Sequence, residues 1–340
     1  MSPPIPDRLR PAVDRGLMAA FGTTELDSVT ALSGGLSGAA VCRIRVGGIA
    51  YALRLTLTRD PLRDPARGFA CMGIAAEACL APRVRYASAE DGVAIMDLVE
   101  AQPLFEYPGD GGPLMVELAQ TVRALHQTPT FPALTDYMAG MEALIGELRA
   151  SGALDPAATA ELFERYAELA GAYRTAPGDV VSSHNDINPG NVIYDGRRLW
   201  LIDWEAAFAA DRYVDLATVA NWFARGDRRA EDLLLATYFG APPTPAQRAR
   251  FEVMQVVNHV FAGVIFLNSA VAERPGAKLA DRTLAAPALA EMHAGLGSGA
   301  VSFARWDDRV AYGKARLGHA LDGLRTDEFT RSLAIVAAAD

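Results

Sequence analysis

The sequence has few lysines and few cysteines, and both shortages exclude classes of protein. Its only lysines are Lys278 and Lys314, so arginine supplies the permanent side-chain positive charges everywhere before them. Cys42, Cys71 and Cys79 are an odd number without metal-like spacing. They predict reduced thiols, and neither a disulfide framework nor a zinc site.

Uninterrupted apolar runs of membrane-spanning length are also missing. The nearest candidate, residues 253–271, is interrupted by five polar side chains: Gln255, Asn258, His259, Asn268 and Ser269. The charged N-terminus, with Asp7 and Arg8 among its first residues, lacks the apolar segment of a secretory signal. We therefore expect a cytoplasmic protein with no membrane partner.

Basic side chains do not balance the acidic ones in the second part of the chain. Residues 1–100 carry 11 basic and 11 acidic side chains, whereas residues 101–340 carry 21 and 30. Nucleic acid is disfavoured as a partner, because its recognition needs a basic surface. The acidity is compatible with a cationic small molecule, since negative clefts concentrate cations. The alternative is that it only keeps the protein in solution.

The most informative stretch runs from Ser182 to Glu205. It contains Asp186, then Asn191 five residues later, then Asp203 after an apolar run. Phosphoryl transfer needs one carboxylate to orient the attacking hydroxyl, and an amide oxygen and a second carboxylate to hold Mg²⁺. These three residues are the candidates for those tasks.

A hairpin is predicted between the second and third of these residues. Residues 192–194 and 199–202 are apolar β-type runs, and Asp195-Gly196 between them is a strong turn signal. Pairing of the two runs would bring Asn191 and Asp203 side by side.

The pattern His184-x-Asp186, Asn191 and then Asp203-Trp-Glu205 resembles the aminoglycoside phosphotransferase / choline kinase family. The resemblance implies an α+β, two-lobed protein-kinase-like fold. Residues 1–99 would form a small antiparallel-sheet N-lobe that covers the nucleotide, and residues 100–340 a mainly helical C-lobe with the acceptor site. It also implies ATP and Mg²⁺ as cofactors and a small-molecule hydroxyl as acceptor, and leaves the oligomeric state open.

The family resemblance also suggests roles for the motif residues. His184 and Asp186 would belong to the catalytic loop, with His184 in a structural role and Asp186 orienting the acceptor hydroxyl or taking its proton. Asn191 and Asp203 would hold Mg²⁺. Glu205 stands where protein kinases have glycine, and would assist the metal or the cation that binds phosphate.

Nucleotide contacts are expected from the first hundred residues. Gly34, Gly35 and Ser37 lie in a loop between two predicted strands, at the place of the family's phosphate-covering loop; a plain glycine turn is the alternative. Arg54 stands on the third strand, where a kinase keeps its phosphate-binding cation. The alternative for Arg54 is an outward-facing position on the sheet.

The partner of Arg54 and the adenine contacts are less determined. Glu77 or Asp64 is the candidate helical carboxylate beside Arg54, and neither is favoured strongly. Residues 96–99 resemble the hinge whose backbone reads adenine, which makes Asp97 and Val99 candidates. A buried strand explains the same residues equally well.

Two further positions match the family in the helical region. Asp215, expected near a helix start, is interpreted as a structural cap that ties the catalytic loop, and His126 as a buried histidine with satisfied hydrogen bonds. Several aromatic and polar side chains on the expected helices would form either an aromatic cage for a quaternary amine or plain core. They are Trp222, Phe223, Asn258, His259, Phe261, Phe266 and Trp306.

Periodicity and breaker residues predict the elements in order. Strands are expected at 29–32, 40–46, 49–55 and 93–99. Helices are expected at 7–21, 66–80, 113–127, 135–151, 156–175, 212–225, 227–239, 245–272, 281–294 and 307–338.

The sequence thus favours a kinase of an amino alcohol, such as choline or ethanolamine, or of an aminoglycoside. A kinase of a sugar or another metabolite is the alternative within the same family. A nucleotide-binding protein without transfer activity is the rival of another class. A protein kinase is third, because no Ala-Pro-Glu ends an activation segment after Asp203.

Overall fold

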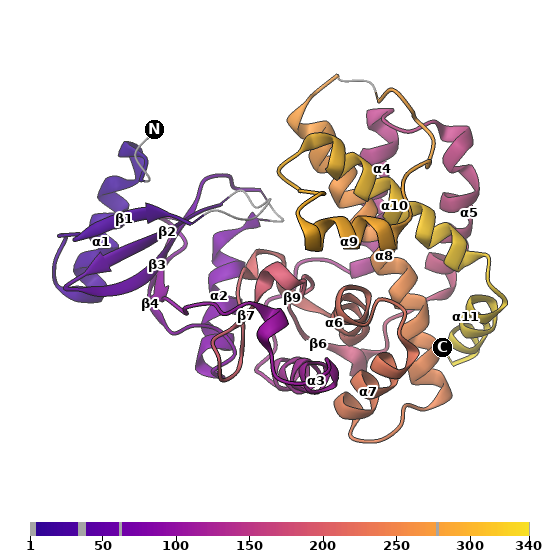
Figure 1. The fold of residues 1–340 in the computed structure, drawn as a ribbon, viewed down its shortest axis with the longest axis horizontal. Helices are drawn as coiled ribbons and strands as arrows, with labels where there is room; N and C mark the ends of the chain where they lie inside the picture. The colour runs from indigo at the N-terminus through magenta and orange to yellow at the C-terminus, as the bar shows by residue number, and fades with distance from the viewer. Residues whose placement is uncertain (1–4, 33–38, 61–62, 277–278, 340) are drawn as a thin grey trace. The chain divides into compact units, whose positions relative to one another are not determined.

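A computed structural model describes residues 5–32, 39–60, 63–276 and 279–339 of the chain (Figure 1). The chain divides into two compact units. Unit 1 comprises Met1–Leu134 and Val180–Ala241, and unit 2 comprises Thr135–Asp179 and Pro242–Asp340. The lobe boundary expected after residue 99 falls within unit 1 and stays a prediction.

Unit 1 begins with a five-stranded antiparallel sheet in the order β1-β2-β3-β5-β4. Gly47 and Gly48 connect β2 to β3 with φ angles of 56° and 79°, a left-handed conformation that glycine adopts without strain. Arg54 lies on β3, opposite Val41 of β2 and Ala94 of β5. The strands are β1 (Ser28–Ala31), β2 (Ala39–Val46), β3 (Ile49–Thr56), β4 (Val84–Ser88) and β5 (Val93–Asp97).

One hydrophobic core joins this sheet to helix α1 (Arg10–Phe21). Ile44, Leu53 and Ile95 of the sheet and Val13 and Leu17 of α1 are all fully buried. Alternate strand residues face this core, and α1 supplies apolar residues four apart, as these two periodicities require. The sheet is therefore held firmly enough to fix the position of β3.

The rest of unit 1 contains two short sheets of two strands each. β6 (Val180–Ser183) pairs with β9 (Phe208–Asp211), and β7 (Val192–Tyr194) pairs with β8 (Leu199–Leu201). The motif residues lie in the two loops that connect β6 to β7 and β8 to β9. The helices of unit 1 besides α1 are α2 (Pro65–Glu77), α3 (Gly112–His126), α6 (Arg212–Val219), a π-helical turn (Ala220–Ala224) and α7 (Arg228–Phe239).

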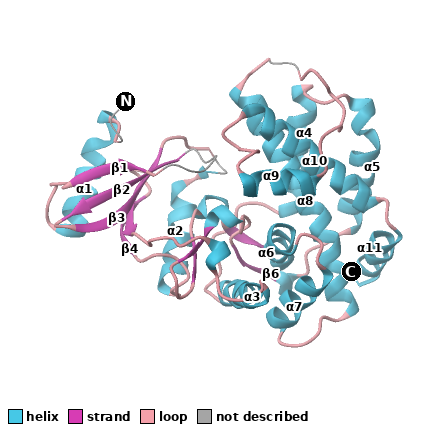
Figure 2. Ribbon diagram, in the orientation of Figure 1, coloured by secondary structure: helices cyan, strands magenta, loops and turns pink. Residues whose placement is uncertain are grey.

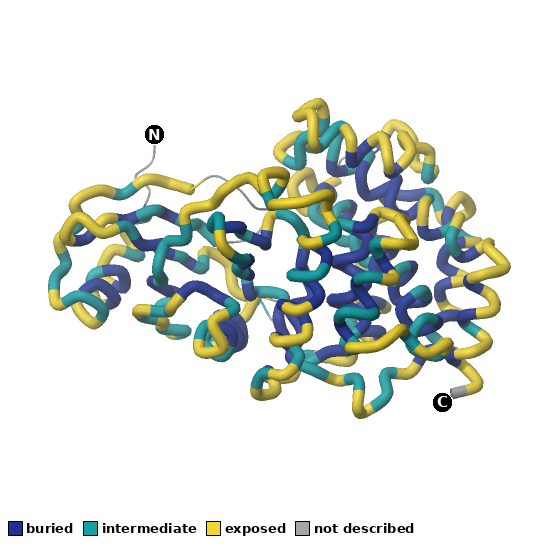
Figure 3. The backbone as a smooth tube through the Cα atoms, turned by 60° about the horizontal axis from the view of Figure 1, so that its bottom comes forward, coloured by how far each residue is buried: buried dark blue, intermediate teal, exposed yellow. Residues whose placement is uncertain are grey.

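In the described part of unit 2 there are helices and loops but no strand (Figure 2). The long helix α8 contacts α4, α10 and α11. Figure 3 shows buried and exposed positions side by side along the chain, and in these helices the buried residues recur on one face while the others are exposed or half-buried. The helices are α4 (Tyr137–Ser151), α5 (Pro156–Ala172), α8 (Pro245–Glu273), α9 (Leu289–Ser298), α10 (Trp306–Leu324) and α11 (Asp327–Ala339).

Helix α8 would suit a membrane by length and composition alone. It is the one such helix among the described residues, and 67% of its most apolar window is buried inside the protein. Burial of this extent is typical of a helix in a protein core. The capping box of Thr244 and Gln247 begins it, with each side chain bonded to the other's backbone N–H.

Three expectations from the sequence were wrong in detail. The helix expected at 281–294 begins only at Leu289, because Pro287 disfavours helix before it and Asp281 and Thr283 form local turns. The helix expected at 307–338 is two helices, since Thr326 bonds the N–H of Phe329 and starts the second. β4 was not expected; it lies at the sheet edge and its pairing is interrupted near its start.

The crossing of α8 and α10 depends on two glycines. A Cβ on Gly263 would lie 2.6 Å from the side chain of Leu317 and 2.9 Å from the carbonyl oxygen of Gly313. A Cβ on Gly313 would lie 2.8 Å from Leu267. The two backbones thus approach too closely for any larger residue at either position.

We predict that Gly263→Ala lowers the free energy of unfolding by about 1–3 kcal/mol, the usual cost of overpacking a core. The control is Gly146→Ala on the exposed face of α4, where a Cβ meets nothing within 4 Å. That substitution should raise the free energy by about 0.5–1 kcal/mol. Denaturant unfolding measures both, and equal effects of the two substitutions would contradict the close crossing.

Candidate active site

The catalytic loop after β6 is held by one buried carboxylate, that of Asp215. It accepts hydrogen bonds from the backbone N–H of His184 at 2.9 Å and of Asn185 at 2.7 Å. His126 contacts it through Nε2 at 3.0 Å, and its Nδ1 lies 2.7 Å from the hydroxyl of Tyr238. The expectation that Asp215 ties this loop is confirmed, as is that of a buried His126 with satisfied hydrogen bonds, but Asp215 is not the cap of a helix.

Asp215 remains ionised despite its burial. Burial alone would raise the pKa of this carboxyl, but its hydrogen bonds with His126 and with the backbone N–H of His184 hold the pKa below its usual value. Asp211, not Asp215, caps α6, because its side chain accepts from the N–H of Tyr213.

His184 is buried completely and serves the structure of the loop. Its Nε2 donates to the carbonyl oxygen of Ile202 at 2.9 Å, and its ring lies 4.6 Å from that of Trp204. Burial lowers the pKa of His184, so the ring is neutral at neutral pH. The contact with Ile202 joins the catalytic loop to the residue just before Asp203.

The Asp186 carboxylate is oriented by two side-chain amides. Asn188 Nδ2 donates to its Oδ1 at 2.9 Å, and Asn191 Nδ2 donates to its Oδ2 at 2.8 Å and to its carbonyl oxygen at 2.9 Å. The side chain is half-buried, so solvent still reaches it. Burial, reinforced by the charge of Asp203, raises the pKa of Asp186 to about 7.

The predicted hairpin is confirmed, and it places Asn191 beside Asp203. Val192 faces Leu201 across the two strands, and the N–H of Ile202 donates to the carbonyl oxygen of Asn191 at 3.0 Å. Asp203 follows with φ of 64°, in the left-handed region. That conformation is strained for a residue with a side chain and is often found at functional sites.

Arg54 pairs with carboxylates from the loop after β8. Its Nη1 lies 2.9 Å from Asp203 Oδ1, and its Nη2 donates to Glu205 Oε2 at 2.7 Å. The arginine side chain is only 13% exposed, so these pairs are partly shielded from water. Arg54 therefore points to the candidate metal residues, not outward from the sheet.

The helical carboxylate expected beside Arg54 does not reach it in the described part of the chain. Glu77 is exposed at the end of α2, and Asp64 caps the start of α2 by accepting from the N–H of Ala66. Glu205 occupies the position of partner instead. Its pKa is raised by burial and by the charge of Asp203, while Arg54 opposes that shift.

The structure describes only two of the remaining nucleotide candidates, Asp97 and Val99. Gly34, Gly35 and Ser37 lie outside the described residues. Asp97 ends β5, where its carboxylate accepts from Arg85 at 2.6 Å and its N–H donates to the carbonyl of Arg83. Val99 is half-buried in the irregular segment that follows. Their contacts with adenine stay predictions.

The donor set fits Mg²⁺ in its chemistry. Asp203, Glu205 and the amide oxygen of Asn191 are hard oxygen ligands, and the Asn191 amide nitrogen is already engaged by Asp186, which leaves its oxygen to face another partner. Among the described residues, no group of three or more His, Cys, Asp or Glu is arranged to hold a metal alone. Mg²⁺ commonly binds through one or two protein carboxylates together with substrate phosphates.

The sequence matches the profile of a family described as "Phosphotransferase enzyme family" over residues 28–251, more than half of the chain. The chain belongs to this family. No protein with a curated function matches the sequence. The fold class is confirmed: an antiparallel-sheet region is followed by a mainly helical remainder, as in kinase-like relatives.

Solved structures share this fold at low sequence identity. A choline/ethanolamine kinase family protein of Mesorhizobium loti has a TM-score of 0.69 at 19% identity, with 97% of this chain and 99% of that chain covered. The choline kinase LicA of Streptococcus pneumoniae has 0.61 at 16%, covering 94% and 99%. The macrolide 2'-phosphotransferase MphH of Brachybacterium faecium has 0.53 at 20%, covering 74% and 90%.

Family and fold together identify a small-molecule kinase. Sequence reasoning singled out the residues that the structure brings together in the loop after β6 and at the ends of the β7–β8 hairpin. It did not single out Arg67, which reaches this site from α2, nor a structural task for the Asn185 side chain. A buried arginine on an otherwise apolar helix was the available signal for Arg67.

The raised pKa of Asp186 predicts a pH dependence of transfer. A carboxylate must be ionised to accept a hydroxyl proton, so activity should fall as pH decreases through about 7. The limiting slope should be tenfold per pH unit, measured as kcat/KM for the acceptor at saturating ATP and Mg²⁺. A profile that stays flat down to pH 5 would contradict the assignment of Asp186.

Proposed function

We propose that this small-molecule kinase transfers the γ-phosphoryl group of ATP to a hydroxyl group of an amino alcohol, of the choline or ethanolamine kind, or of an aminoglycoside. The observation that carries the transfer step is the Asp186 carboxylate, held by two amides beside Asn191 and Asp203. That arrangement supplies an orienting base next to hard oxygen ligands. It is what transfer to a hydroxyl requires.

Asp186 orients the acceptor in this proposal. One carboxylate oxygen accepts the hydroxyl hydrogen, and the hydroxyl oxygen attacks the γ-phosphorus as ADP leaves. The amides of Asn188 and Asn191 restrict the carboxylate to one orientation, so little freedom is lost when the acceptor binds. The pKa of about 7 keeps Asp186 ready to take the proton near neutral pH.

Asn191 and Asp203 would hold Mg²⁺ in this proposal, with Glu205 as the adjacent carboxylate. Bound Mg²⁺ supplies positive charge that offsets the charge of the phosphates. Arg54 is the cation nearest to these carboxylates and would contact the phosphates of ATP. Nucleotide use is supported by relatives of known structure, which include LicA in complex with AMP and a spectinomycin phosphotransferase in complex with ADP.

Two observations support a cationic acceptor. The negative net charge of the chain resides in residues 101–340, which favours accumulation of cations. Several similar structures are those of choline or ethanolamine kinases. Asn258 and His259 on α8 are buried, and the ring of His259 contacts that of His319. These two residues therefore belong to the core of unit 2, and no aromatic cage is assigned.

The first experiment is a screen for consumption of ATP with Mg²⁺ and a panel of acceptors. The panel contains choline, ethanolamine, aminoglycosides and sugars, and mass spectrometry identifies the phosphorylated product. Turnover with an amino alcohol or aminoglycoside is the expected result. Turnover only with sugars would replace the acceptor class. ATP binding without any turnover would favour a nucleotide-binding protein with no transfer activity.

Asp186→Asn is the control for that screen. It keeps the shape of the side chain but removes its charge and its ability to accept a proton, so kcat should fall at least 100-fold, within the usual contribution of a general base. Binding of ATP, followed by thermal shift, should persist. Turnover at the wild-type rate would refute the role given to Asp186.

Arg54→Ala should raise the KM for ATP and lower kcat, because it leaves Asp203 and Glu205 without their cation. Loss of one charge-assisted contact of about 1.5–3 kcal/mol corresponds to roughly a 10- to 150-fold decrease in kcat/KM for ATP. The matched control is Arg43→Ala on β2, whose ion pair with Glu100 is at the surface. Equal kinetics of the two variants would show that Arg54 has no part in nucleotide use.

A further inference from the structure

Three successive carbonyl groups after Asp203 accept hydrogen bonds from buried side chains. Arg67 Nη2 donates to the carbonyl of Glu205 at 2.6 Å, and its Nε donates to that of Ala207 at 3.1 Å. Between them, Asn185 Nδ2 donates to the carbonyl of Ala206 at 3.0 Å. The backbone that follows the metal candidates is thus fixed by two side chains.

Arg67 reaches this backbone from α2, on the sheet side of unit 1. The residue is 6% exposed, and α2 lies close enough that a Cβ on Gly68 would come within 3.4 Å of the carbonyl of Trp204. The Cys71 sulfur lies 3.5 Å from the carbonyl of Ala207. Helix α2 therefore contacts residues 204–207 directly along one helical turn, from Arg67 to Cys71.

Asn185 reaches the same segment from the catalytic loop. It is 3% exposed, and its φ of 63° is left-handed. Its Oδ1 accepts from the hydroxyl of Ser183 at 2.8 Å, and its own N–H is bonded to Asp215. These two contacts fix the side-chain amide of Asn185 in the orientation in which it donates to the carbonyl of Ala206.

Among the described residues, this arrangement stands in place of an ion pair between Arg54 and a carboxylate of α2. Protein kinases align the phosphate-binding cation with a carboxylate on the helix that corresponds to α2. Here the carboxylate of α2, Glu77, is exposed at the end of the helix, Arg54 pairs with Glu205, and the buried charged side chain of α2 is Arg67. The helix acts on the backbone of this segment, and the segment in turn holds Arg54.

We infer that Arg67 is a positioning residue for the metal site. It fixes the 203–207 backbone, and through it the carboxylates of Asp203 and Glu205, against the catalytic loop. The inference rests on the proposed function for its kinetic consequence. It predicts that loss of Arg67 weakens use of the metal and leaves binding of the acceptor unchanged.

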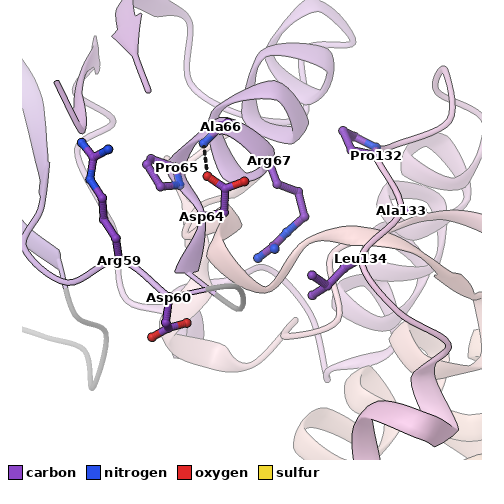
Figure 4. A pocket seen from close by; sticks show the side chains of 9 residues that line it. All are labelled: Arg59, Asp60, Asp64, Pro65, Ala66, Arg67, Pro132, Ala133 and Leu134. Atoms are coloured by element: carbon purple, nitrogen blue, oxygen red, sulfur yellow. Dashed lines mark hydrogen bonds between the residues drawn. The ribbon is translucent and has the colours of Figure 1, made fainter. Parts of the chain in front are cut away.

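The surroundings of Arg67 make a rescue experiment possible. Arg67 also lines a cavity of about 710 Å³ between the start of α2 and residues 132–134. Figure 4 shows its side chain extending from α2 between Asp64 and Leu134. Removal of the side chain would leave a space next to this cavity, which a free guanidinium ion could enter.

The test compares wild type, Arg67→Ala and Arg67→Lys, with Arg59→Ala as the matched control. Arg59 lines the same cavity but is exposed, and it donates to the carbonyl of Glu90 rather than to the 203–207 segment. The Mg²⁺ concentration that gives half-maximal rate should rise about tenfold in Arg67→Ala, while the KM for the acceptor stays unchanged. Guanidinium chloride at millimolar concentration should partly restore the Mg²⁺ dependence of Arg67→Ala.

Two readouts do not depend on turnover. Mn²⁺ titrations in the presence of ADP, followed by electron paramagnetic resonance, should show weaker metal binding in both Arg67 variants. Hydrogen exchange of the peptide that covers residues 203–211 should be faster than in wild type. Lysine preserves the charge but lacks the planar fork that reaches two carbonyls, so Arg67→Lys should fold and still show both changes.

The outcomes separate the inference from the proposed function. If wild type transfers no phosphoryl group to any acceptor, the proposed function fails, while metal binding and exchange still decide the role of Arg67. If wild type is active and the Arg67 variants keep its Mg²⁺ dependence, metal binding and exchange, the inference is overturned. A rise in the KM for the acceptor alone would also overturn it.

Discussion

The candidate active site depends on one buried interaction, the acceptance of two consecutive backbone N–H groups by Asp215. These N–H groups belong to His184 and Asn185, which directly precede Asp186. A buried carboxylate that accepts several hydrogen bonds stays ionised and cannot be replaced by a neutral group without leaving N–H groups unpaired. His126 and Tyr238 complete the network on its far side. The loop geometry therefore follows from charge buried in the core of unit 1.

Around this fixed loop, two further sets of contacts arrange the reactive groups. The β7–β8 hairpin sets Asp203 beside Asn191 by the geometry of antiparallel pairing. Buried donors on α2 and on the catalytic loop then fix the backbone beyond Asp203. Each of these contacts lies within unit 1.

Local signals in the sequence were enough to predict the motif, the hairpin and most of the helices. Asp195-Gly196 fixed the turn, and the apolar runs beside it could pair in only one direction. The partner of Arg54 could not be predicted, since it depends on how a loop far along the chain approaches β3. The sequence left Glu77, Asp64 and Glu205 open as partners. The structure pairs Arg54 with Glu205. For residues 281–287 the local signals were misleading. Their composition is typical of a helix, whereas the structure shows local turns there.

The ion pairs of Arg54 also have a thermodynamic consequence. In the protein without ligands, one guanidinium already neutralises part of the charge of Asp203 and Glu205. A metal ion at these carboxylates and a phosphate at Arg54 each compete with the same pair of contacts. Binding of the metal would release Arg54 for the phosphate, and binding of the phosphate would release the two carboxylates for the metal. Metal and nucleotide should therefore favour each other's binding by the same factor. If the proposed function holds, Arg54 would be a counter-ion of Asp203 and Glu205 that the metal replaces when the nucleotide binds.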